Sequence, residues 1–435
     1  MTASLRTVTL GCKVNQYETE LVREGLVRFG YHDAVEDEQA QLCVVNTCTV
    51  TSDGDSKSRY TIRKLARENP DSRIVVMGCY ATRAPDELLK LPNVVEVVTD
   101  KRELPDVLQR YGVIDLPSGI SRFGTRHRAY VKVQDGCLLR CSYCIIPQVR
   151  PHVSSRPLQH IVEEVQRLVA NGYREVVLTG VHLGHYGVES NWNKPKEAWL
   201  RLSTLLRELV KLPGDFRLRL SSIEATEVTR ELISVMADNR QRIAPHLHLC
   251  LQSGSDSVLR RMRRRWSSRM FIDRCQMLRD ALDAPAITTD IIVGFPGETE
   301  AEFEATLETA RASAFSKIHI FPYSARKGTP AAEMPGQISF EVKTERSARL
   351  AELEKQMQRE YLASLVGKPL ELLVEGEIDA PPLDASIAPL ATSSARMQLG
   401  TTCRYVPLEL RSNLAGDGDL TIVTPTAVAG DRLIA

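Results

Sequence analysis

The chain has 435 residues, of which 43% are hydrophobic and 26% are charged, so it is a globular chain long enough for two to four domains. Its 56 basic and 55 acidic side chains leave a net charge of +1, which excludes a histone-like nucleic-acid binder but not a local basic patch. No stretch approaches the ~20 apolar residues of a membrane span, and the N-terminus lacks a signal-peptide pattern, so we expect a cytoplasmic protein without membrane contact.

Residues 1–112 alternate short apolar runs with helical patterns. Strands are expected at Thr7–Leu10, Leu42–Asn46, Ile74–Met77 and Val94–Val98, and helices near 17–29, 56–68, 84–90 and 101–110. This alternation predicts an α/β domain with a doubly wound parallel sheet. Residues 113–128 are rich in Gly, Ser and Arg without helical periodicity, which indicates a linker.

Residues 129–338 repeat the alternation of strands and helices. Strands are expected at 129–133, 174–179, 216–221, 246–251, 286–293 and 316–321, with helices near 157–171, 197–211, 226–237, 256–281 and 299–313. The pattern predicts a partial (β/α)6 barrel, followed by a connecting helix over 339–365. Residues 366–435 contain short β-prone runs at Leu370–Val374, Tyr405–Leu410 and Leu420–Val423, which predict a small C-terminal β-barrel.

The densest chemical motif is Cys137-Leu-Leu-Arg-Cys141-Ser-Tyr-Cys144, directly after the expected strand 129–133. Short loops bring its three thiolates around one soft metal site at little entropic cost. A structural zinc ion requires four ligands, whereas a cubane iron–sulfur cluster on three cysteines keeps one iron open. The cluster is favoured over a distantly completed zinc site or a chance grouping, because the loop lies at the barrel mouth, where such folds place their chemistry.

A second set of cysteines is scattered in sequence but occupies equivalent positions. Cys12, Cys48 and Cys79 each lie just past the carboxyl end of an expected parallel strand. Because such strand ends meet in one crevice, the three thiolates can converge on a second site. The alternative is that they are buried free cysteines, which is how we interpret Cys43.

Positive charge is concentrated in the middle of the chain. Residues 1–125 have a net charge of −2 and residues 366–435 one of −4, so +7 remains on residues 126–365. A run free of acidic residues carries the proposed RNA contacts: Arg260, Arg261, Arg263, Arg264, Arg265, Trp266 and Arg269. We expect these arginines to contact phosphates and Trp266 to stack on a base, rather than to form a solvated helix face.

The combination of motifs resembles the radical S-adenosylmethionine (SAM) methylthiotransferases over essentially the whole chain. The motifs that carry the resemblance are Gly11–Glu18, Asn46–Cys48, Gly78–Cys79, Tyr130–Cys137, Ile146–Pro147, Ser155–Pro157, Leu251–Ser255, Arg261–Arg264 and Gly294–Thr299. Lys13-Val14-Asn15-Gln16-Tyr17-Glu18 is similar to the branch that acts on N6-threonylcarbamoyladenosine in tRNA. The isopentenyladenosine branch, with a Gln-Met-Asn pattern there, and the ribosomal-protein branch are the alternatives. The C-terminal segment resembles the TRAM domain, although it is acidic.

The resemblance implies two [4Fe–4S] clusters, one on Cys137, Cys141 and Cys144 and one on Cys12, Cys48 and Cys79. It implies two SAM molecules per turnover, one to methylate a sulfur carried by the second cluster and one to generate a radical. The product would carry a methylthio group at C2 of the modified adenosine 37. The partners would be the anticodon stem-loop of tRNA, an electron donor such as flavodoxin or ferredoxin, and a sulfur source.

Residues at the expected strand ends are the candidate SAM contacts: Thr179, Gly180, Ser222, Glu224, Gln252 and Gly294. The glycines can equally serve turns, and Ser222 and Glu224 can cap helices. His182 and His185 lie near the same mouth and remain unassigned. Two departures from the family pattern, Pro151-His152 and Cys250, touch no cluster cysteine. A non-catalytic iron–sulfur or RNA-binding protein is a further alternative, which the intact Cys137–Cys144 motif argues against.

Overall fold

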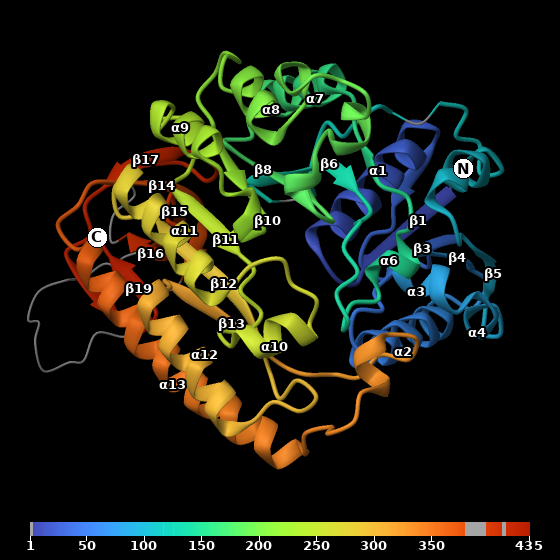
Figure 1. Cartoon of the computed structure of the whole chain (residues 1–435). Helices are drawn as coiled ribbons and strands as arrows, with labels where there is room; N and C mark the ends of the chain where they lie inside the picture. Colours follow the sequence, from blue (N-terminus) through green and yellow to red (C-terminus); the bar gives the residue numbers. More distant parts are fainter. Residues whose placement is uncertain (1–2, 116, 125, 379–396, 411–414) are drawn as a thin grey trace, which may run out of the picture.

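The computed structural model describes residues 3–115, 117–124, 126–378, 397–410 and 415–435 (Figure 1). Its N-terminal part is a five-stranded parallel sheet in the order β2-β1-β3-β4-β5. The strands are β1 (Ala3–Thr9), β2 (Tyr31–Asp33), β3 (Leu42–Thr47), β4 (Arg73–Gly78) and β5 (Val94–Val97). The helices are α1 (Lys13–Arg28), α2 (Ser52–Glu68), α3 (Cys79–Arg83), α4 (Pro85–Leu89) and α5 (Leu104–Gln109).

Both faces of this sheet are covered by helices. Leu26 of α1 and Val107 of α5 pack with Val44 in one apolar cluster, and Ile62 of α2 and Leu88 of α4 belong to a separate one. Two cores on opposite faces of one parallel sheet are the mark of a doubly wound domain. The predicted α/β class is confirmed.

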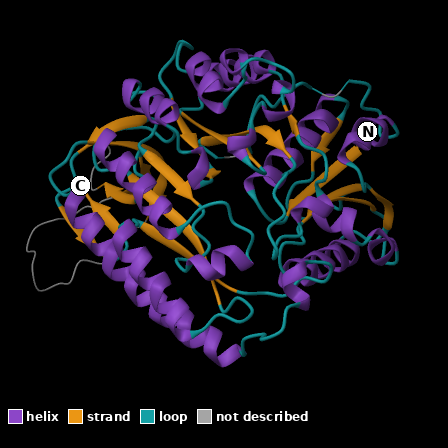
Figure 2. Cartoon of the chain, viewed as in Figure 1, coloured by secondary structure: helices purple, strands orange, loops and turns teal. Residues whose placement is uncertain are grey.

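The central part is a curved arrangement of strands with helices outside them (Figure 2), in which all pairs are parallel except β6 with the short β7. The strands form two sheets, β7-β6-β8-β9 and β10-β11-β12-β13, which are joined by a bridge between Leu218 and Ile243. The strands are β6 (Arg128–Asp135), β7 (Ser154–Ser155), β8 (Glu175–Gly180), β9 (Arg217–Leu220), β10 (Ser222–Ile223), β11 (His246–Leu249), β12 (Ala286–Val293) and β13 (Lys317–Pro322). Each of the six expected strands therefore has a counterpart.

Helices surround these strands, and all of them except the short α6, which packs against α3 of the first domain, share one large core with the strands. They are α6 (Ile146–Val149), α7 (Leu158–Ala170), α8 (Leu202–Leu209), α9 (Arg230–Asp238), α10 (Asp256–Arg261), α11 (Ser268–Ala281), α12 (Glu300–Ser313) and α13 (Phe340–Leu365). Short 3-10 helices occur at Lys101–Glu103, Leu183–His185, Val188–Asn191, Lys196–Ala198, Ala225–Glu227 and Pro330–Glu333. Two residues of the expected linker, Ile120 and Phe123, pack into this core and tie the first domain to the barrel.

The C-terminal part is a six-stranded sheet in the order β17-β14-β15-β16-β19-β18. Its strands are β14 (Leu370–Ile378), β15 (Met397–Thr402), β16 (Pro407–Leu410), β17 (Leu420–Val423), β18 (Ala427–Ala429) and β19 (Arg432–Ile434). It packs against the amino ends of the barrel strands, where Arg217 and Arg219 donate to the carbonyls of Thr401 and Thr402. The opposite end of the barrel is thereby left for the cysteine loop.

Candidate functional site

The loop with the cysteine motif leaves the carboxyl end of β6. Its sharp turn requires Gly136, which has φ +73°, and a Cβ there would lie 2.2 Å from the carbonyl oxygen of His152. The side chain of Gln134 donates to the carbonyls of Asp135 and Gly136 at 2.7 and 2.8 Å. These contacts hold the loop so that Cys137, Cys141 and Cys144 follow in one compact segment.

The structure also brings the three scattered cysteines together. Cys12 precedes α1, Cys48 follows β3 and Cys79 begins α3, at the carboxyl ends of three neighbouring strands. Burial raises the pKa of the Cys48 thiol, and the adjacent Cys79 and Cys12 raise it further. Gly11 permits this approach, because a Cβ there would lie 2.9 Å from that of Cys48.

The sulfurs of each triad are not packed as closely as the ligands of a single zinc ion. Three sulfurs on one zinc ion lie about 3.8 Å apart, given Zn–S bonds of about 2.3 Å. Among the described residues, no three cysteine sulfurs lie within 4.8 Å of one another. The ten cysteines are free, so both triads can supply thiolates to a larger iron–sulfur cubane.

An arginine contacts one sulfur of the barrel triad. Nη1 of Arg264 donates to Sγ of Cys141 at 2.9 Å, and Nη2 donates to Glu224 at 2.5 Å. The guanidinium lies over the ring of Trp266, 4.1 Å from its centroid, and its side chain is only 4% exposed. Burial raises the pKa of Glu224, and Arg264 opposes that shift. The charge of this arginine is therefore directed at a cysteine.

His182 contacts another sulfur of the same triad. Its Nδ1 atom lies 3.5 Å from Sγ of Cys137, and its Nε2 atom contacts the carboxylate of Glu227. Burial alone would lower the pKa of His182, but its hydrogen bonds with Cys137 and Glu227 raise it to about 9. The sequence analysis predicted that His182 lies near the barrel mouth, but it did not predict the contact with Cys137.

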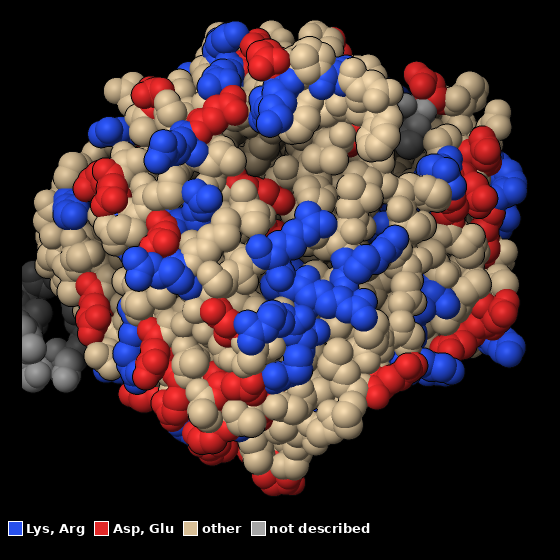
Figure 3. Space-filling view, viewed as in Figure 1, with Lys and Arg blue, Asp and Glu red and all other residues tan. Residues whose placement is uncertain are grey.

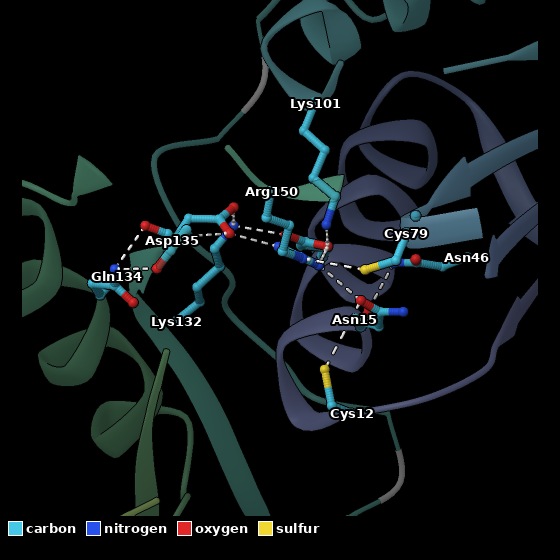
Figure 4. Close-up of polar contacts among 12 residues, drawn as sticks. Cys12, Asn15, Asn46, Cys79, Lys101, Lys132, Gln134, Asp135 and Arg150 are labelled. Atoms are coloured by element: carbon cyan, nitrogen blue, oxygen red, sulfur yellow. Dashed lines mark hydrogen bonds and ion pairs between the residues drawn. The ribbon is translucent and has the colours of Figure 1, made fainter. Parts of the chain in front are cut away.

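A buried arginine in the segment after α6 connects the two cysteine sets (Figure 4). Nε of Arg150 donates to Sγ of Cys79 at 3.4 Å, and Nη2 donates to the side-chain oxygen of Asn15 at 2.8 Å. Nη1 donates to Glu18 at 2.9 Å and to Asp135 at 2.7 Å. Arg150 thus touches both the first domain and the β6 end of the barrel.

A pocket of about 240 Å³ lies where the two domains meet. Val50 and Thr51, just after Cys48, line one side, and Cys144 and Gln252 line the other. Phe321 also lines it and is 46% exposed. A planar ring placed here would lie beside Cys144 and beside the segment that follows Cys48, with an aromatic side chain available for stacking.

The six expected SAM contacts are distributed over the barrel. Thr179 and Gly180 end β8, Glu224 and Gln252 are buried beside the cysteine loop, and Ser222 is exposed on β10. Gly294 packs against Lys343, whose Cγ would lie 2.2 Å from an added Cβ. That contact gives Gly294 a packing role, and SAM binding by these residues stays a prediction.

Basic side chains gather near the centre of one face, around α10 (Figure 3). Arg260, Arg263 and Arg265 are exposed there. The prediction for their neighbours must be corrected, because Trp266 is buried and Arg264 points inward to Cys141. Arg261 pairs with Glu302 at 2.9 Å. Of the predicted RNA contacts, Arg260, Arg263 and Arg265 have exposed side chains, and their contact with RNA phosphates stays a prediction.

Two family models match the chain: uncharacterized protein family UPF0004 over residues 4–100 and the radical SAM superfamily over residues 131–310. Among curated proteins, the chain is 42% identical to the threonylcarbamoyladenosine tRNA methylthiotransferase MtaB of Bacillus subtilis, covering 84% of each. It is 38% identical to the MtaB of Thermotoga maritima, covering 86% of each. It is 34% identical to a tRNA-2-methylthio-N(6)-dimethylallyladenosine synthase of Mycolicibacterium vanbaalenii, covering 98% of this chain and 86% of that protein.

Solved structures with a similar fold have little sequence similarity. The radical SAM methyltransferase TsrM from Kitasatospora setae superposes with a TM-score of 0.56 at 15% identity, covering 76% of this chain and 75% of that one. The cobalamin-dependent SAM radical enzyme OxsB gives a TM-score of 0.51 at 11% identity, covering 82% and 56%. Among the described helices, none is long and apolar enough to cross a membrane.

Proposed function

Because this chain belongs to the radical SAM methylthiotransferases, we propose that it adds a methylthio group to C2 of N6-threonylcarbamoyladenosine at position 37 of tRNA. The MtaB relatives support the substrate, since they match at up to 42% identity. The observation that carries the proposal is the shared pocket, which is bordered by Cys144 and by the residues after Cys48. A base bound there would be within reach of both the radical source and the sulfur carrier.

The chain uses two [4Fe–4S] clusters and SAM. We propose that Cys137, Cys141 and Cys144 hold one cluster with an open iron for SAM, and that Cys12, Cys48 and Cys79 hold the other. When bound, these groups supply reductive SAM cleavage and a sulfur to be methylated. The protein then has to orient the base, exclude water and hold the two cluster sites in fixed positions relative to each other.

The remaining partners follow from the same chemistry. Reductive cleavage requires an electron donor such as flavodoxin or ferredoxin, and each turnover consumes sulfur that a sulfur source must replace. The reaction takes place on the anticodon stem-loop, which the exposed arginines around α10 can hold by its phosphates. We place the enzyme in the cytoplasm, where this tRNA is found.

The test is mass spectrometry of tRNA nucleosides from a deletion strain. Loss of 2-methylthio-N6-threonylcarbamoyladenosine, with the isopentenyl counterpart retained, is expected. Complementation with Cys141→Ala and with Cys48→Ala should fail for different reasons. The purified Cys141→Ala protein should not form 5′-deoxyadenosine, whereas Cys48→Ala should form it without methylthiolating RNA. A deletion strain with unchanged nucleosides would refute the proposal.

A further inference from the structure

We propose that Arg150 is a positioning residue for the N-terminal thiolate site: it donates to Cys79, raises the reduction potential of the cluster held there and ties it to the cysteine loop of the barrel. This inference rests on the proposed function for the identity of the bound group. Membership of the family does not by itself give Arg150 a function. The contacts that carry it are shown in Figure 4.

Arg150 belongs to the chain segment that follows the barrel's cysteine loop, and it reaches the N-terminal site through its side chain. It directly follows α6, which begins two residues after Cys144, and its backbone N–H donates to the carbonyl of Ile146 at 2.8 Å. Cys79, Ile145 and Val149 form one small buried cluster. The short helix is thus clamped to α3 by apolar packing and by the Nε–Sγ hydrogen bond.

The charges around Arg150 do not cancel. Two carboxylates, Glu18 and Asp135, contact three cations, Arg150, Lys101 and Lys132, in the interface between the domains. Burial lowers the pKa of Lys101, and Arg150 and Lys132 lower it further despite the attraction of Glu18. One positive charge is therefore in excess, and a thiolate at Cys79 would balance it, whereas a neutral thiol would not.

A positive charge and a hydrogen bond at a cluster thiolate favour the reduced, more negative form. They therefore raise the reduction potential. Arginine suits this role because its planar fork donates in several fixed directions at once, here to a sulfur, an amide and two carboxylates. A lysine at position 150 would keep the charge but could not keep all four contacts.

The experiment uses full-length protein carrying Cys141→Ala, so that only the N-terminal cluster is reconstituted. Redox titration followed by electron paramagnetic resonance should show a more negative midpoint for Arg150→Gln and a smaller shift for Arg150→Lys. The matched control is Arg156→Gln. Arg156 bridges Tyr17 and Glu164 in the same interface without a hydrogen bond to a cysteine among its described contacts, so its midpoint should equal the parent's.

The outcomes separate this inference from the proposed function, because the titration contains no RNA. Equal midpoint potentials for Arg150→Gln and the parent would overturn the proposed role of Arg150, whichever substrate the enzyme modifies. If Arg150→Gln loses its iron, the Arg150→Lys midpoint decides in its place. With intact barrel cysteines, Arg150→Gln should keep 5′-deoxyadenosine formation within twofold and lower methylthiolation at least tenfold.

A second observation concerns Lys13, the residue after Cys12. We infer that its ammonium binds the carboxylate of the threonylcarbamoyl group, an inference that also rests on the proposed function. Its Nζ atom lies 5.8 Å from the ring centroid of Tyr405, and none of the hydrogen bonds or ion pairs found among the described residues engages it. Its positive charge contributes to the lowered pKa values of His246 and His319, behind the larger effect of burial.

The ring of Tyr405 also lies beside that of His246 on β11, with the two centroids 4.9 Å apart, so the Lys13 ammonium is near this strand of the barrel. His248, Asp290 and His319 lie together there, with the two imidazole rings 5.6 Å apart. Asp290 also lines the pocket beside Cys144, so this polar group and the pocket are contiguous. The ammonium of Lys13 adds a positive charge beside this polar group without an ion-pair partner among the described residues, and a carboxylate entering from the pocket would supply one.

The test compares two anticodon stem-loops, one carrying threonylcarbamoyladenosine and one carrying its threonine amide. Lys13→Gln should lower kcat/KM at least tenfold for the acid and less than threefold for the amide. Lys13→Arg should retain the preference for the acid. Equal losses on both RNAs would overturn the inference. No activity of the parent on either RNA, with normal 5′-deoxyadenosine formation, would instead refute the proposed substrate.

Discussion

The run of arginines at 260–265 should separate into two functions when its members are replaced singly. Arg264 is buried, donates to Cys141 and Glu224, and lies over Trp266. Replacing it by Gln leaves the buried carboxylate of Glu224 without its ion-pair partner. Breaking a buried pair in this way costs about 3–5 kcal/mol.

The exposed arginines should behave in the opposite way. Arg260→Ala and Arg265→Ala should change the free energy of unfolding by no more than about 0.5 kcal/mol, because their side chains are at the surface. If each contacts one phosphate, each should flatten the slope of log K against log salt by up to ~0.9. Replacing Arg264 should therefore lower the stability of the protein, whereas replacing Arg260 or Arg265 should change the salt dependence of tRNA binding.

The assay is urea unfolding of each variant, together with tRNA binding over a series of salt concentrations. Iron content is measured on the same samples. Arg264→Gln should unfold at lower urea and lose iron, and it should keep the parent's salt slope where it remains folded. An Arg264→Gln protein of parental stability with a flattened salt slope would refute the buried role and restore the prediction of an RNA contact.

Three further variants test the packing around the site. Glu175→Gln should destabilise the protein by about 3–5 kcal/mol, since it leaves the buried Arg219 without a carboxylate partner among the described residues and Arg217 with Glu371 alone; unfolding midpoints would show this, and a loss below 1 kcal/mol would contradict it. Burial alone would raise the pKa of Glu175, but these arginines hold it well below its ordinary value. The ion pairs of Glu175 should therefore contribute fully to the free energy of unfolding above the pKa of Glu175 in the unfolded chain. That contribution should be lost as the pH falls through the lowered pKa of the folded protein. Gly136→Ala should lose the barrel cluster and about half of the iron, because φ +73° and the adjacent backbone leave no room for a Cβ; full iron would contradict this. Cys43→Ala, in the core of the first domain, should keep its iron and lose no more than about 2 kcal/mol of stability.

Much of the fold could be predicted from the sequence, because parallel strands buried on both faces are continuous apolar runs. This holds for β3 and β4, whose bounds lie close to those expected. The bounds of β12 also agree with the prediction, although Thr288, Thr289 and Asp290 interrupt its apolar residues. It fails for β2, where Tyr31-His32-Asp33 is a three-residue polar edge strand, and for β15, which was not expected. A short edge strand such as β2 is defined by its neighbour rather than by its own composition. The strand β15 lies inside its sheet, but its sequence Met-Gln-Leu-Gly-Thr-Thr is not an apolar run.

The cysteine motif and the equivalent strand-end positions of Cys12, Cys48 and Cys79 were visible in the sequence, because parallel strands bring their carboxyl ends to one edge. The direction of individual arginines was not. Helix α10 ends at Arg261, and Arg263 adopts φ +60°, which turns the next residue inward. Arg150 and Cys79 are 71 residues apart and meet only when the domains dock. The sequence shows which chemical groups the chain has and how far apart they are along it. Whether a charged side chain is buried, and with which group it pairs, depends on surfaces that meet only in the tertiary structure.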